Sequence, residues 1–445
     1  MSSSSWNLVE AFAIGESALV SIVGGGGKTS LLFGLANELP GRVVVTTTTR
    51  IFAAQMKLAT AVLYENDLAQ LDTILTKHDH CLIVGETQGD KAHGVSAELP
   101  SQLLTRGDVD YVLVEADGSR MLPIKAPKAH EPVVSPATTH LVPVVGIDAL
   151  AKPLAEVAHR PQLVSELTAV SPTDYLTPQA IARLLAHPNG GSKQAPPAAT
   201  IIPLINKVET AAQLAQARQI AAATLQYPTI DRVVIGAMRQ PQPVVEVRQR
   251  ITAVILAAGL GSRMGQATKQ LLPWGETTVL GQTICNVQQT AVTDMVVISG
   301  HEADKIEAVT AEARVRTVYN PDYATGEMLS SLKTAVRHLP DNCDAILVML
   351  ADQPMVLPET LNQLLDAFAQ TPADLMAPTY QGKRGNPVLI GRHYFAELLA
   401  LSPDEAPRTL LQRHADKLQL VPVASDSILR DLDRVEDYER ERPFV

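Results

Sequence analysis

The 445-residue sequence has few cysteines and no excess of positively charged residues. Its three cysteines lie far apart and form neither a CxxC motif nor a Cys/His cluster, which predicts no disulfide framework and no zinc site. Lys and Arg number 37 against 47 Asp and Glu. This balance argues against a nucleic-acid partner, because coating a phosphate backbone needs an excess of positive charge.

Long apolar segments are also missing. No run of 18 apolar residues occurs, and the N-terminus lacks the basic start and apolar core of a secretory signal. We therefore expect a cytoplasmic protein with no membrane partner. The composition that is present, 46% hydrophobic and 19% charged with 30 prolines and 26 glycines, is typical of a globular protein.

Short β-rich runs alternate with helical patterns along the whole chain, which predicts parallel βαβ units and the α/β fold class. The expected strands are Ala18–Val23, Arg42–Val45, Tyr111–Val114, His140–Val145, Thr200–Leu204, Thr252–Ala257, Met295–Ser299, Ala345–Leu350 and Leu418–Val423. The expected helices are Gln179–Leu185, Thr210–Leu225, Val279–Gln289, Leu329–His338 and Pro358–Ala369.

The length predicts two domains, because 445 residues exceed what one hydrophobic core usually serves. The segment RQPQPVVEVRQR, Arg239–Arg250, has prolines that disfavour a central strand and charges that favour solvent. We therefore expect an N-terminal domain over residues 1–240, a linker over 241–250 and a C-terminal domain over 251–445.

The strongest motif of the second half is ILAAGLGSRMG, Ile255–Gly265, which follows a predicted strand. Glycines at such a turn let several backbone N–H groups converge on phosphate oxygens. Arg263 adds a planar fork for two of these oxygens, and Lys269 adds a compact cation. A Rossmann dinucleotide turn is the alternative, but it requires G-x-G-x-x-G and the sixth position here is Met264.

Two acidic residues follow predicted strands of the same half. Asp352 ends the apolar run AILVMLADQP, and Asp433 lies in DLDRVEDY. Ligands of open α/β sheets bind beyond the carboxyl ends of strands, and Mg²⁺ takes one or two carboxylates together with phosphate oxygens. Each aspartate alone is also typical of a turn or helix cap, so the metal site is predicted from the pair.

These motifs together resemble the molybdenum cofactor cytidylyltransferase family, MocA, and its guanylyl-transferring relative MobA. The resemblance spans nearly all of residues 251–445. It implies a Rossmann-like three-layer nucleotidyltransferase fold, CTP or GTP with Mg²⁺, and a phosphorylated molybdopterin-type cofactor as acceptor. By this resemblance, the nucleotide-binding residues are Leu256, Ala257, Ala258, Gly259, Gly261 and Ser262, the catalytic residues are Arg263, Lys269 and Asp352, and the metal ligands are Asp352 and Asp433.

CTP is the expected donor, because the resemblance places Ala258 where guanylyl-transferring members usually have glycine. A methyl group there narrows the base pocket in favour of a pyrimidine. The expected reaction is in-line attack by the terminal phosphate of the pterin on the α-phosphorus of CTP, with pyrophosphate leaving.

The acceptor side resembles the family less closely. NPDYATGEMLSSLK resembles the family's helix start, where a bound phosphate and a plain N-cap are both compatible with the sequence. The segment PDEAPR lacks the glycines of the corresponding family motif. The acceptor-binding residues implied by the resemblance are Ser330, Ser331, Asn386, Asp404 and Arg408.

The first half contains SIVGGGGKTSLL, a strand followed by four glycines and a helical pattern. The loop from Gly24 through Gly27 can cradle phosphates, Lys28 can reach the β- and γ-phosphates, and Thr29 can ligate Mg²⁺. The spacing is shorter than a full P-loop, and a glycine turn without a ligand is the alternative. We expect a P-loop-like site for ATP or GTP.

YVLVEADGSR ends a predicted strand in Glu115 and Asp117, which we expect to reach Mg²⁺ or to orient water beside the glycine loop. LINKVE is similar to the Asn-Lys-x-Asp motif with which GTPases bind guanine, but Glu209 replaces the aspartate, so the base stays open. Lys125, Lys128 and His130 are consistent either with contact to an anionic cofactor or with a solvated basic loop.

EADGSRMLPIKAPKAHEP, VVGIDAL and the pair His159-Arg160 are similar to the YqeC family, accessory factors for selenium-dependent molybdenum hydroxylases. Two halves that each resemble molybdenum-cofactor proteins predict one pathway: a cytidylyltransferase fused to an NTP-dependent accessory domain, with a molybdenum hydroxylase apo-enzyme as recipient. The alternatives are a guanylyltransferase of the same cofactor, a non-catalytic cofactor chaperone and a sugar-phosphate nucleotidyltransferase.

Overall fold

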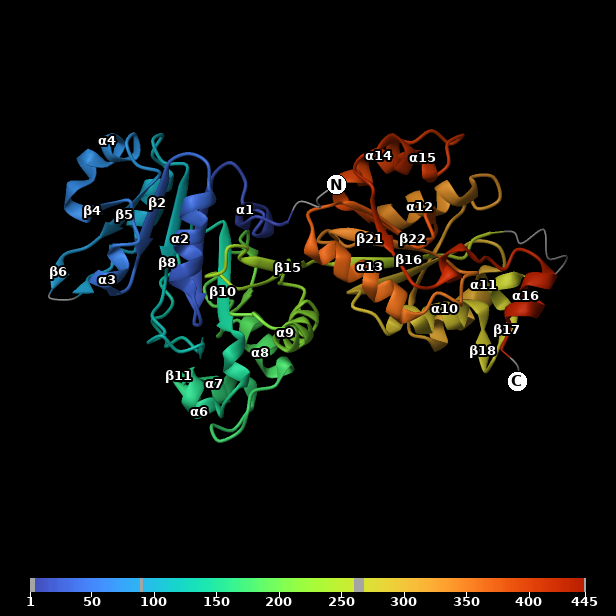
Figure 1. The fold of residues 1–445 in the computed structure, drawn as a ribbon, viewed down its shortest axis with the longest axis horizontal. Coiled ribbons are helices and arrows are strands. Elements are labelled where there is room, and N and C mark those ends of the chain that lie inside the picture. The colour runs from blue at the N-terminus through green and yellow to red at the C-terminus, as the bar shows by residue number, and fades with distance from the viewer. Residues whose placement is uncertain (1–4, 89–90, 260–267, 444–445) are drawn as a thin grey trace. The chain divides into compact units, whose positions relative to one another are not determined.

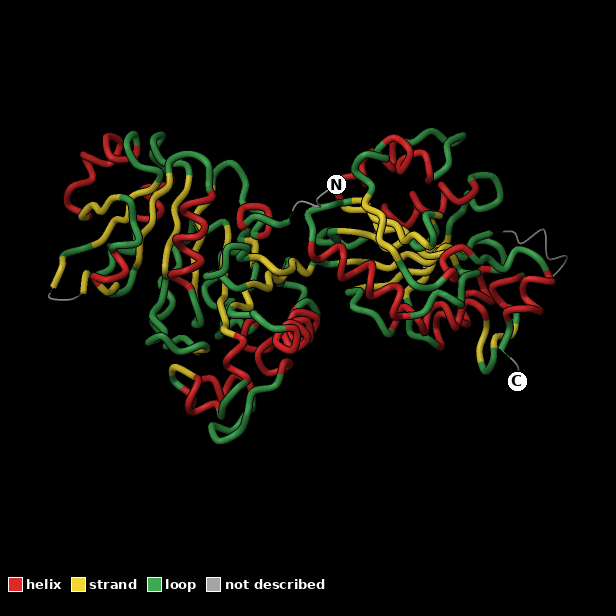
Figure 2. The backbone as a smooth tube through the Cα atoms, viewed as in Figure 1, coloured by secondary structure: helices red, strands yellow, loops and turns green. Residues whose placement is uncertain are grey.

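The computed structural model describes residues 5–88, 91–259 and 268–443. The chain divides into two compact units, residues 1–248 and 249–445, and both mix helices with sheets rich in parallel strands (Figures 1 and 2). The α/β class predicted from the sequence is thus observed in each unit. Among the described residues, no helix is long and apolar enough to cross a membrane.

In the N-terminal unit, ten of the described strands form one sheet in the order β15-β14-β13-β10-β1-β8-β2-β5-β4, with β12 beside β10. All of its pairings are parallel except that of β14 with β15. The strands are β1 Ala18–Gly24, β2 Val43–Thr47, β4 Ala61–Tyr64, β5 His80–Val84, β8 Tyr111–Glu115, β10 His140–Gly146, β12 Thr200–Ile201, β13 Leu204–Asn206, β14 Val233–Gly236 and β15 Val244–Arg248.

Both faces of this sheet are covered. Successive residues of a strand point to opposite faces, and Leu19 and Val20 of β1 accordingly belong to two separate hydrophobic clusters. Helices α1 and α2 pack on the Val20 side, and α5, α7, α8 and α9 contribute to the Leu19 side. The helices are α1 Leu8–Ala11, α2 Lys28–Glu38, α3 Ala53–Met56, α4 Leu71–Leu75, α5 Leu99–Leu104, α6 Leu154–Val157, α7 Pro161–Thr168, α8 Pro178–Ala186 and α9 Ala211–Thr224.

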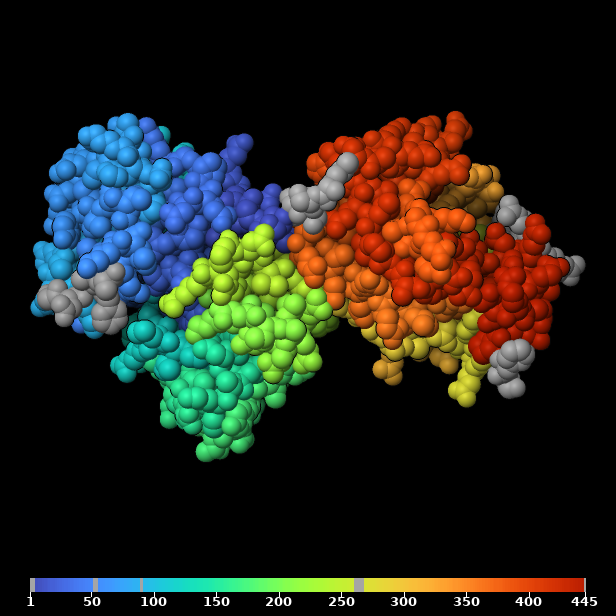
Figure 3. Space-filling model, viewed as in Figure 1, coloured from blue at the N-terminus to red at the C-terminus, as the bar shows by residue number. Residues whose placement is uncertain are grey.

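Small sheets complete this unit. β9 pairs with β11 beside the main sheet, and α6, α7 and α8 gather next to them as the green lobe at the bottom of Figures 1 and 3. Two further short pairings connect β3, β7 and β6. The bounds are β3 Ile51–Phe52, β6 Thr87–Gln88, β7 Lys91–Ala92, β9 Ile124–Lys125 and β11 Ala158–His159.

The structure differs from the sequence prediction over residues 241–250, which were expected as a linker. Residues 244–248 form the edge strand β15, antiparallel to β14. Glu246 is fully buried there, and its carboxylate accepts hydrogen bonds from Arg218 and Arg248. The prolines that suggested a linker precede the strand, and a buried charge is stable because two arginines neutralise it.

In the C-terminal unit, eight of the described strands form a mixed sheet in the order β20-β19-β16-β21-β24-β22-β23, with β25 beside β22. β20, β19, β16 and β21 are parallel, and β24 is antiparallel to both of its neighbours. The strands are β16 Ile251–Leu256, β19 Asp294–Ser299, β20 Arg316–Tyr319, β21 Ala345–Leu350, β22 Leu375–Tyr380, β23 Lys383–Arg384, β24 Val388–Gly391 and β25 Gln419–Pro422.

Helices cover both faces of this sheet as well. Ala253 and Ile255 of β16 pack in one cluster with α10 and α13, whereas Val254 packs in the other with α12 and α14. This three-layer arrangement agrees with the predicted Rossmann-like fold. The remaining elements are α10 Val279–Gln288, α11 Ala303–Glu312, α12 Glu327–Arg337, α13 Pro358–Gln370, α14 Phe395–Ala400, α15 Arg408–Arg413, α16 Val435–Glu441 and the hairpin of β17 Pro273–Trp274 with β18 Thr277–Thr278.

Candidate functional sites

The glycine loop of the N-terminal unit connects β1 directly to α2. Gly24, Gly26 and Gly27 have φ angles of 93°, 90° and 130°, a region that residues with a side chain rarely adopt. A Cβ on Gly26 would also lie 2.2 Å from the backbone nitrogen of Gly146. Glycine is therefore required here, and the loop presents its backbone at the N-terminus of α2, where N–H groups are free to bind anions.

Lys28, the first residue of α2, lies among negative groups. Its Nζ donates to the carbonyl oxygen of Gly24 at 2.7 Å and lies 3.3 Å from Asp117 and 3.6 Å from Glu115. The side chain is almost completely buried. Burial opposes the charged form, but the charges of Asp117 and Glu115 outweigh it and raise the pKa of Lys28, so the ammonium group is retained.

The two predicted acids have different surroundings. Asp117 accepts from the backbone N–H of Gly24 and contacts Lys125 at 3.0 Å as well as Lys28, and it does not line the cavity described below. Glu115 does line this cavity, and one of its oxygens accepts from the Thr29 hydroxyl at 3.0 Å. Glu115 and Thr29 therefore present neighbouring oxygens to the cavity, whereas Asp117 is bonded to the loop and to two lysines.

Asn206, at the end of β13, is hydrogen-bonded to the glycine loop. Its amide donates to the carbonyl oxygen of Gly26 at 2.9 Å, and its side-chain oxygen accepts from the backbone of Lys207 and Met238. The side chain of Lys207 lies 2.7 Å from Asp148. The LINKVE motif is thus part of the same site, although 180 residues separate Asn206 from Gly26.

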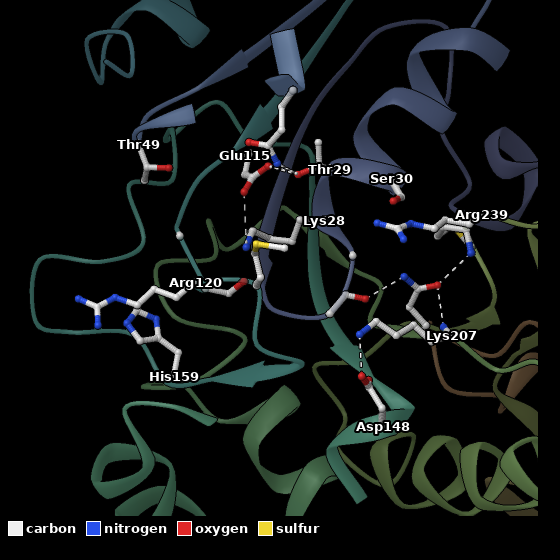
Figure 4. Close-up of a pocket in the computed structure, with 18 of the residues that line it drawn as sticks. Lys28, Thr29, Ser30, Thr49, Glu115, Arg120, Asp148, His159, Lys207 and Arg239 are labelled. Carbon is white, nitrogen blue, oxygen red and sulfur yellow. Dashed lines mark hydrogen bonds and ion pairs between the residues drawn. The ribbon is translucent and has the colours of Figure 1, made fainter. Parts of the chain in front are cut away.

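Most of these groups, but neither Asp117 nor Gly24, line a cavity of about 1500 Å³ (Figure 4). Lys28, Thr29 and Glu115 lie in the middle of the view; Asp148, Lys207 and Arg239 lie on one side, and Arg120 and His159 on the other. The sequence did not predict roles for Arg120 or Arg239, and it related Asn206 only to base binding, because their approach to the loop depends on the order of strands in the sheet.

The predicted basic segment divides into a buried and an exposed part. Lys125 is buried and contacts Asp117 and Glu131, whereas Lys128 and His130 are exposed and do not line the cavity. A solvated loop is therefore correct for Lys128 and His130 and wrong for Lys125. Both oxygens of Glu131 accept from Arg160, at 2.5 and 2.9 Å.

Charge pairing dominates at Glu131. Burial alone would raise its pKa, but Arg160 and Lys125 outweigh burial and lower the pKa to about 2. The carboxylate is consequently charged at every physiological pH and joins β9 to the chain segment before α7.

The second site lies at the carboxyl ends of β16 and β21. The two strands pair in parallel up to Leu256 and Leu350, and the backbone N–H of Ala351 donates to Leu256. Asp352 thus lies at the edge where the predicted glycine turn begins. Leu256, Ala257, Ala258 and Gly259 are described at this edge, whereas Gly261, Ser262 and Arg263 lie outside the described residues.

Lys269 joins the two predicted metal ligands. Its Nζ donates to Asp352 and lies 3.2 Å from Asp433. Asp352 is only 8% exposed. Burial would lower the pKa of Lys269, but Asp352 and Asp433 outweigh it and raise the pKa, so this lysine also retains its charge. The sequence therefore predicted three residues that the fold brings together across 164 positions.

Asp431 is a third carboxylate beside this group that the sequence analysis missed. It accepts from the Gln353 amide at 2.5 Å, and burial and the charges of Asp352 and Asp433 raise its pKa. Asp431 lies two residues before Asp433 in the sequence DLDR. This spacing was the signal from which a second carboxylate near Asp433 could have been predicted. No group of three His, Cys, Asp or Glu side chains within the described residues is placed to hold a metal ion by itself. Two carboxylates suffice for Mg²⁺ when a substrate supplies phosphate oxygens.

The backbone after β16, where Ala258 lies, is tightly packed. A Cβ on Gly300, after β19, would lie 2.8 Å from the Cβ of Ala258 and 2.5 Å from that of Tyr323. Ala258 is 5% exposed, and its carbonyl oxygen accepts from the backbone of His301. The methyl group of Ala258 is therefore packed against Gly300 at this edge of the sheet.

The predicted acceptor residues are dispersed. Asn320 donates to both Ser330 and Ser331, at 2.8 and 3.0 Å, and Ser331 is buried. Asn386 precedes a cis proline and donates from its backbone to Ile428. Among the described residues, Asp404 and Arg408 make no hydrogen bond or ion pair with Lys269, Asp352 or Asp433; both are exposed around the start of α15.

Comparison with known proteins defines the class of each unit. Residues 253–418 match the MobA-like NTP transferase domain, and residues 20–162 match the YqeC protein family. The C-terminal unit is therefore a nucleotidyltransferase domain, as the sequence predicted. The chain belongs to the YqeC family through its N-terminal unit, and the predicted fusion is confirmed.

Individual relatives agree with this division. The chain is 33% identical over 195 residues to the YqeC protein of Escherichia coli K12, covering 42% of this chain and 75% of that relative. It is 26% identical over 193 residues to the molybdenum cofactor cytidylyltransferase of the same organism, covering 42% and 93%. It is also 28% identical over 202 residues to nicotine blue oxidoreductase of Paenarthrobacter nicotinovorans, covering 43% and 95%.

Proposed function

We propose that the C-terminal unit transfers CMP from CTP to a molybdopterin-type cofactor with release of pyrophosphate. The observation that carries the proposal is Lys269 held between Asp352 and Asp433 at the carboxyl edge of the sheet. A cation and two carboxylates at this edge suit phosphoryl chemistry, in which positioning and charge stabilisation do most of the work. The similarity to a molybdenum cofactor cytidylyltransferase supports the choice of substrate.

The roles follow from charge. Asp352 and Asp433 would hold Mg²⁺, which supplies positive charge to the phosphates when bound. Lys269, which contacts both carboxylates, would stabilise the charge that develops on the α-phosphate. Gly259, Gly261, Ser262 and Arg263 belong to the proposed triphosphate site, and Ala257 and Ala258 to the base pocket. Ser330, Ser331, Asn386, Asp404 and Arg408 form the proposed acceptor side.

We further propose that the N-terminal unit binds ATP or GTP on the loop Gly24–Gly27, with Lys28 at the terminal phosphates and Glu115 and Thr29 as ligands of Mg²⁺. Buried Lys28 and the glycine backbone support this site. As an accessory domain, it would use the nucleotide to prepare or deliver the cofactor to a molybdenum hydroxylase apo-enzyme.

The test is to incubate the full chain with molybdopterin cofactor and each nucleoside triphosphate in turn, and to identify products by mass spectrometry. We expect a cytosine dinucleotide of the cofactor and one pyrophosphate for each transfer. A guanine product would assign the guanylyltransferase, and tight cofactor binding without pyrophosphate would assign a chaperone. Turnover of sugar phosphates, or a redox reaction as named for the nicotine blue relative, would contradict the proposal.

A further inference from the structure

The cavity of the N-terminal unit is larger than one nucleotide requires. Its volume of about 1500 Å³ exceeds the roughly 300–1,000 Å³ of a typical small-molecule site. In Figure 4, the glycine loop side chains Lys28 and Thr29 lie between two walls, and Arg120 and His159 form the wall opposite Arg239. A nucleotide bound along the loop toward one wall leaves the other wall available to a second ligand.

Arg120 is held in this wall by an unusual backbone. Arg120 and Met121 have φ angles of 52° and 63°, in the left-handed region that non-glycine residues seldom adopt. Such strain gathers at functional sites, because the surrounding structure must maintain it. No hydrogen bond or ion pair of the Arg120 side chain occurs within the described chain, although this side chain lines the cavity. The neighbouring cations Lys125 and Arg160 are both paired with Glu131.

His159 adds a complementary group to the same wall. Its Nδ1 is buried and has no hydrogen-bond partner among the described residues, while the ring bonds to the backbone of Gly118. Burial first, and then the charges of Arg160, Lys125 and Arg120, lower the pKa of His159, so the imidazole is neutral near pH 7. Since the bond to Gly118 favours the charged form, the ring donates there, and the remaining Nδ1 is an acceptor.

We propose that Arg120 and His159 bind the phosphate group of a second, phosphate-bearing ligand in the same cavity as the nucleotide. The guanidinium donates two parallel hydrogen bonds to phosphate oxygens. A phosphate with its second pKa near 6 still carries a proton part of the time at pH 7, and this proton can be donated to Nδ1 of His159. Sulfate and carboxylates have no such proton at pH 7, so they can accept hydrogen bonds from Arg120 but cannot donate one to His159.

This second site is joined to the loop by a continuous series of ion pairs. Arg160, beside His159, contacts Glu131; Glu131 contacts Lys125; and Lys125 contacts Asp117, which accepts from the N–H of Gly24. The series therefore connects the wall of Arg120 and His159 to the loop. The inference rests on the proposed nucleotide site for the occupant of the loop, but the phosphate site has its own residues.

Calorimetric titration of the full chain with inorganic phosphate at pH 7 tests the proposal. The protein is first saturated with the β,γ-imido analogue of ATP or GTP, so that the loop is filled. We expect Arg120→Gln to weaken the phosphate binding at least tenfold and to leave analogue binding within twofold. Arg239→Gln is the matched control, because it removes an exposed arginine from the opposite wall, and it should leave phosphate binding unchanged.

Sulfate provides the second arm. We expect wild type to bind sulfate several-fold more weakly than phosphate, and His159→Phe to remove this difference by weakening phosphate alone; circular dichroism verifies that each variant folds. Equal phosphate binding by Arg120→Gln and Arg239→Gln would overturn the proposal, as would equal affinity of wild type for sulfate and phosphate. Arg120-dependent phosphate binding without any analogue binding would support this site and refute the nucleotide site.

Discussion

Lys28 in one unit and Lys269 in the other each lie between two carboxylates beyond the carboxyl ends of parallel strands, but the two lysines differ in how tightly their surroundings hold them. Lys28 is 4% exposed, starts a helix and is also tied to the carbonyl oxygen of Gly24. Lys269 is half-buried, and its partner Asp433 has a side chain that is 46% exposed. Lys28 is therefore the more confined of the two, and the proposed function requires that Lys269 exchange its carboxylates for a substrate.

The largest expected effect concerns Lys269. We predict that Lys269→Met lowers the rate of CTP-dependent pyrophosphate release about 100-fold or more, because a charged donor aimed at the developing charge is lost. Steady-state release at saturating CTP and cofactor measures this. Lys28→Met should stay within twofold of wild type in the same assay, and an equal loss in both variants would remove the distinction between the two lysines.

Nucleotide binding by the N-terminal unit should show the opposite pattern for the two lysine variants. We predict that Lys28→Met weakens binding of a fluorescent ATP or GTP analogue by about 10–100-fold, the loss of one hydrogen bond to a charged group, while Lys269→Met leaves it unchanged. We also expect Lys28→Met to destabilise the N-terminal unit by about 3 kcal/mol, because Glu115 and Asp117 lose a buried partner. Lys269→Met should cost its unit less, since water reaches Asp433.

Stability of each unit can be followed separately. The sequence has two tryptophans, Trp6 in the N-terminal unit and Trp274 in the C-terminal unit. In a Trp274→Phe background, fluorescence during urea unfolding therefore reports the N-terminal unit, and a Trp6→Phe background reports the other. A larger loss of stability for Lys269→Met than for Lys28→Met would contradict the conclusion that Lys28 is the more tightly held lysine.

The pH dependence of the N-terminal unit provides a third prediction. The pKa of Glu131 falls from 4.5 to about 2 on folding, a difference of 2.5, so its pairing contributes about 3 kcal/mol at neutral pH. Because the folded-state pKa is the lower one, this contribution is complete above pH 4.5 and is lost as the pH falls toward 2. Glu131→Gln should therefore cost about 3 kcal/mol at pH 7 and progressively less below pH 4.5. Trp6 fluorescence during urea unfolding at each pH measures this loss of stability. A loss that stays constant from pH 7 to pH 3 would disprove the low pKa of Glu131.

The smallest expected effects are those of substitutions at the neighbouring residues Ser330 and Ser331, which should differ in kind. Ser331 is buried and already bonded to Asn320, so Ser331→Ala should lower stability by about 1 kcal/mol with the KM for the acceptor unchanged. Ser330 is half-buried at the start of α12, and Ser330→Ala should raise the acceptor KM two- to fivefold. Kinetics with varied cofactor concentration distinguish the two, and identical behaviour would exclude Ser330 from the acceptor site.

The sequence predicted local structure and the composition of the sites better than the long-range order of the sheets. The predicted strand Ala345–Leu350 agrees with β21, and Lys269, Asp352 and Asp433 meet as expected. The run of apolar residues and the acids at strand ends were sufficient, because parallel strands end at one edge.

Other features depended on neighbours that no local pattern specifies. β22, which contains Pro378, was not among the predicted strands, and β15, which follows two prolines, was predicted as part of a linker. Pairing with adjacent strands decides the structure of both. Asn206 reaches Gly26 only because β10 alone separates β13 from β1. The contact of Arg160 with Glu131 likewise follows from the pairing of β9 with β11.

Nucleotidyl transfer by the group of Lys269, Asp352 and Asp433 is the main prediction for the C-terminal unit. Its most direct test is a single-turnover measurement with Asp352→Asn, using CTP labelled at the α-phosphate and molybdopterin cofactor, with Asp117→Asn as the matched change in the other unit. We predict that label transfer falls at least 100-fold in Asp352→Asn, which remains folded, and is unaffected in Asp117→Asn. Transfer at the wild-type rate by Asp352→Asn would contradict it.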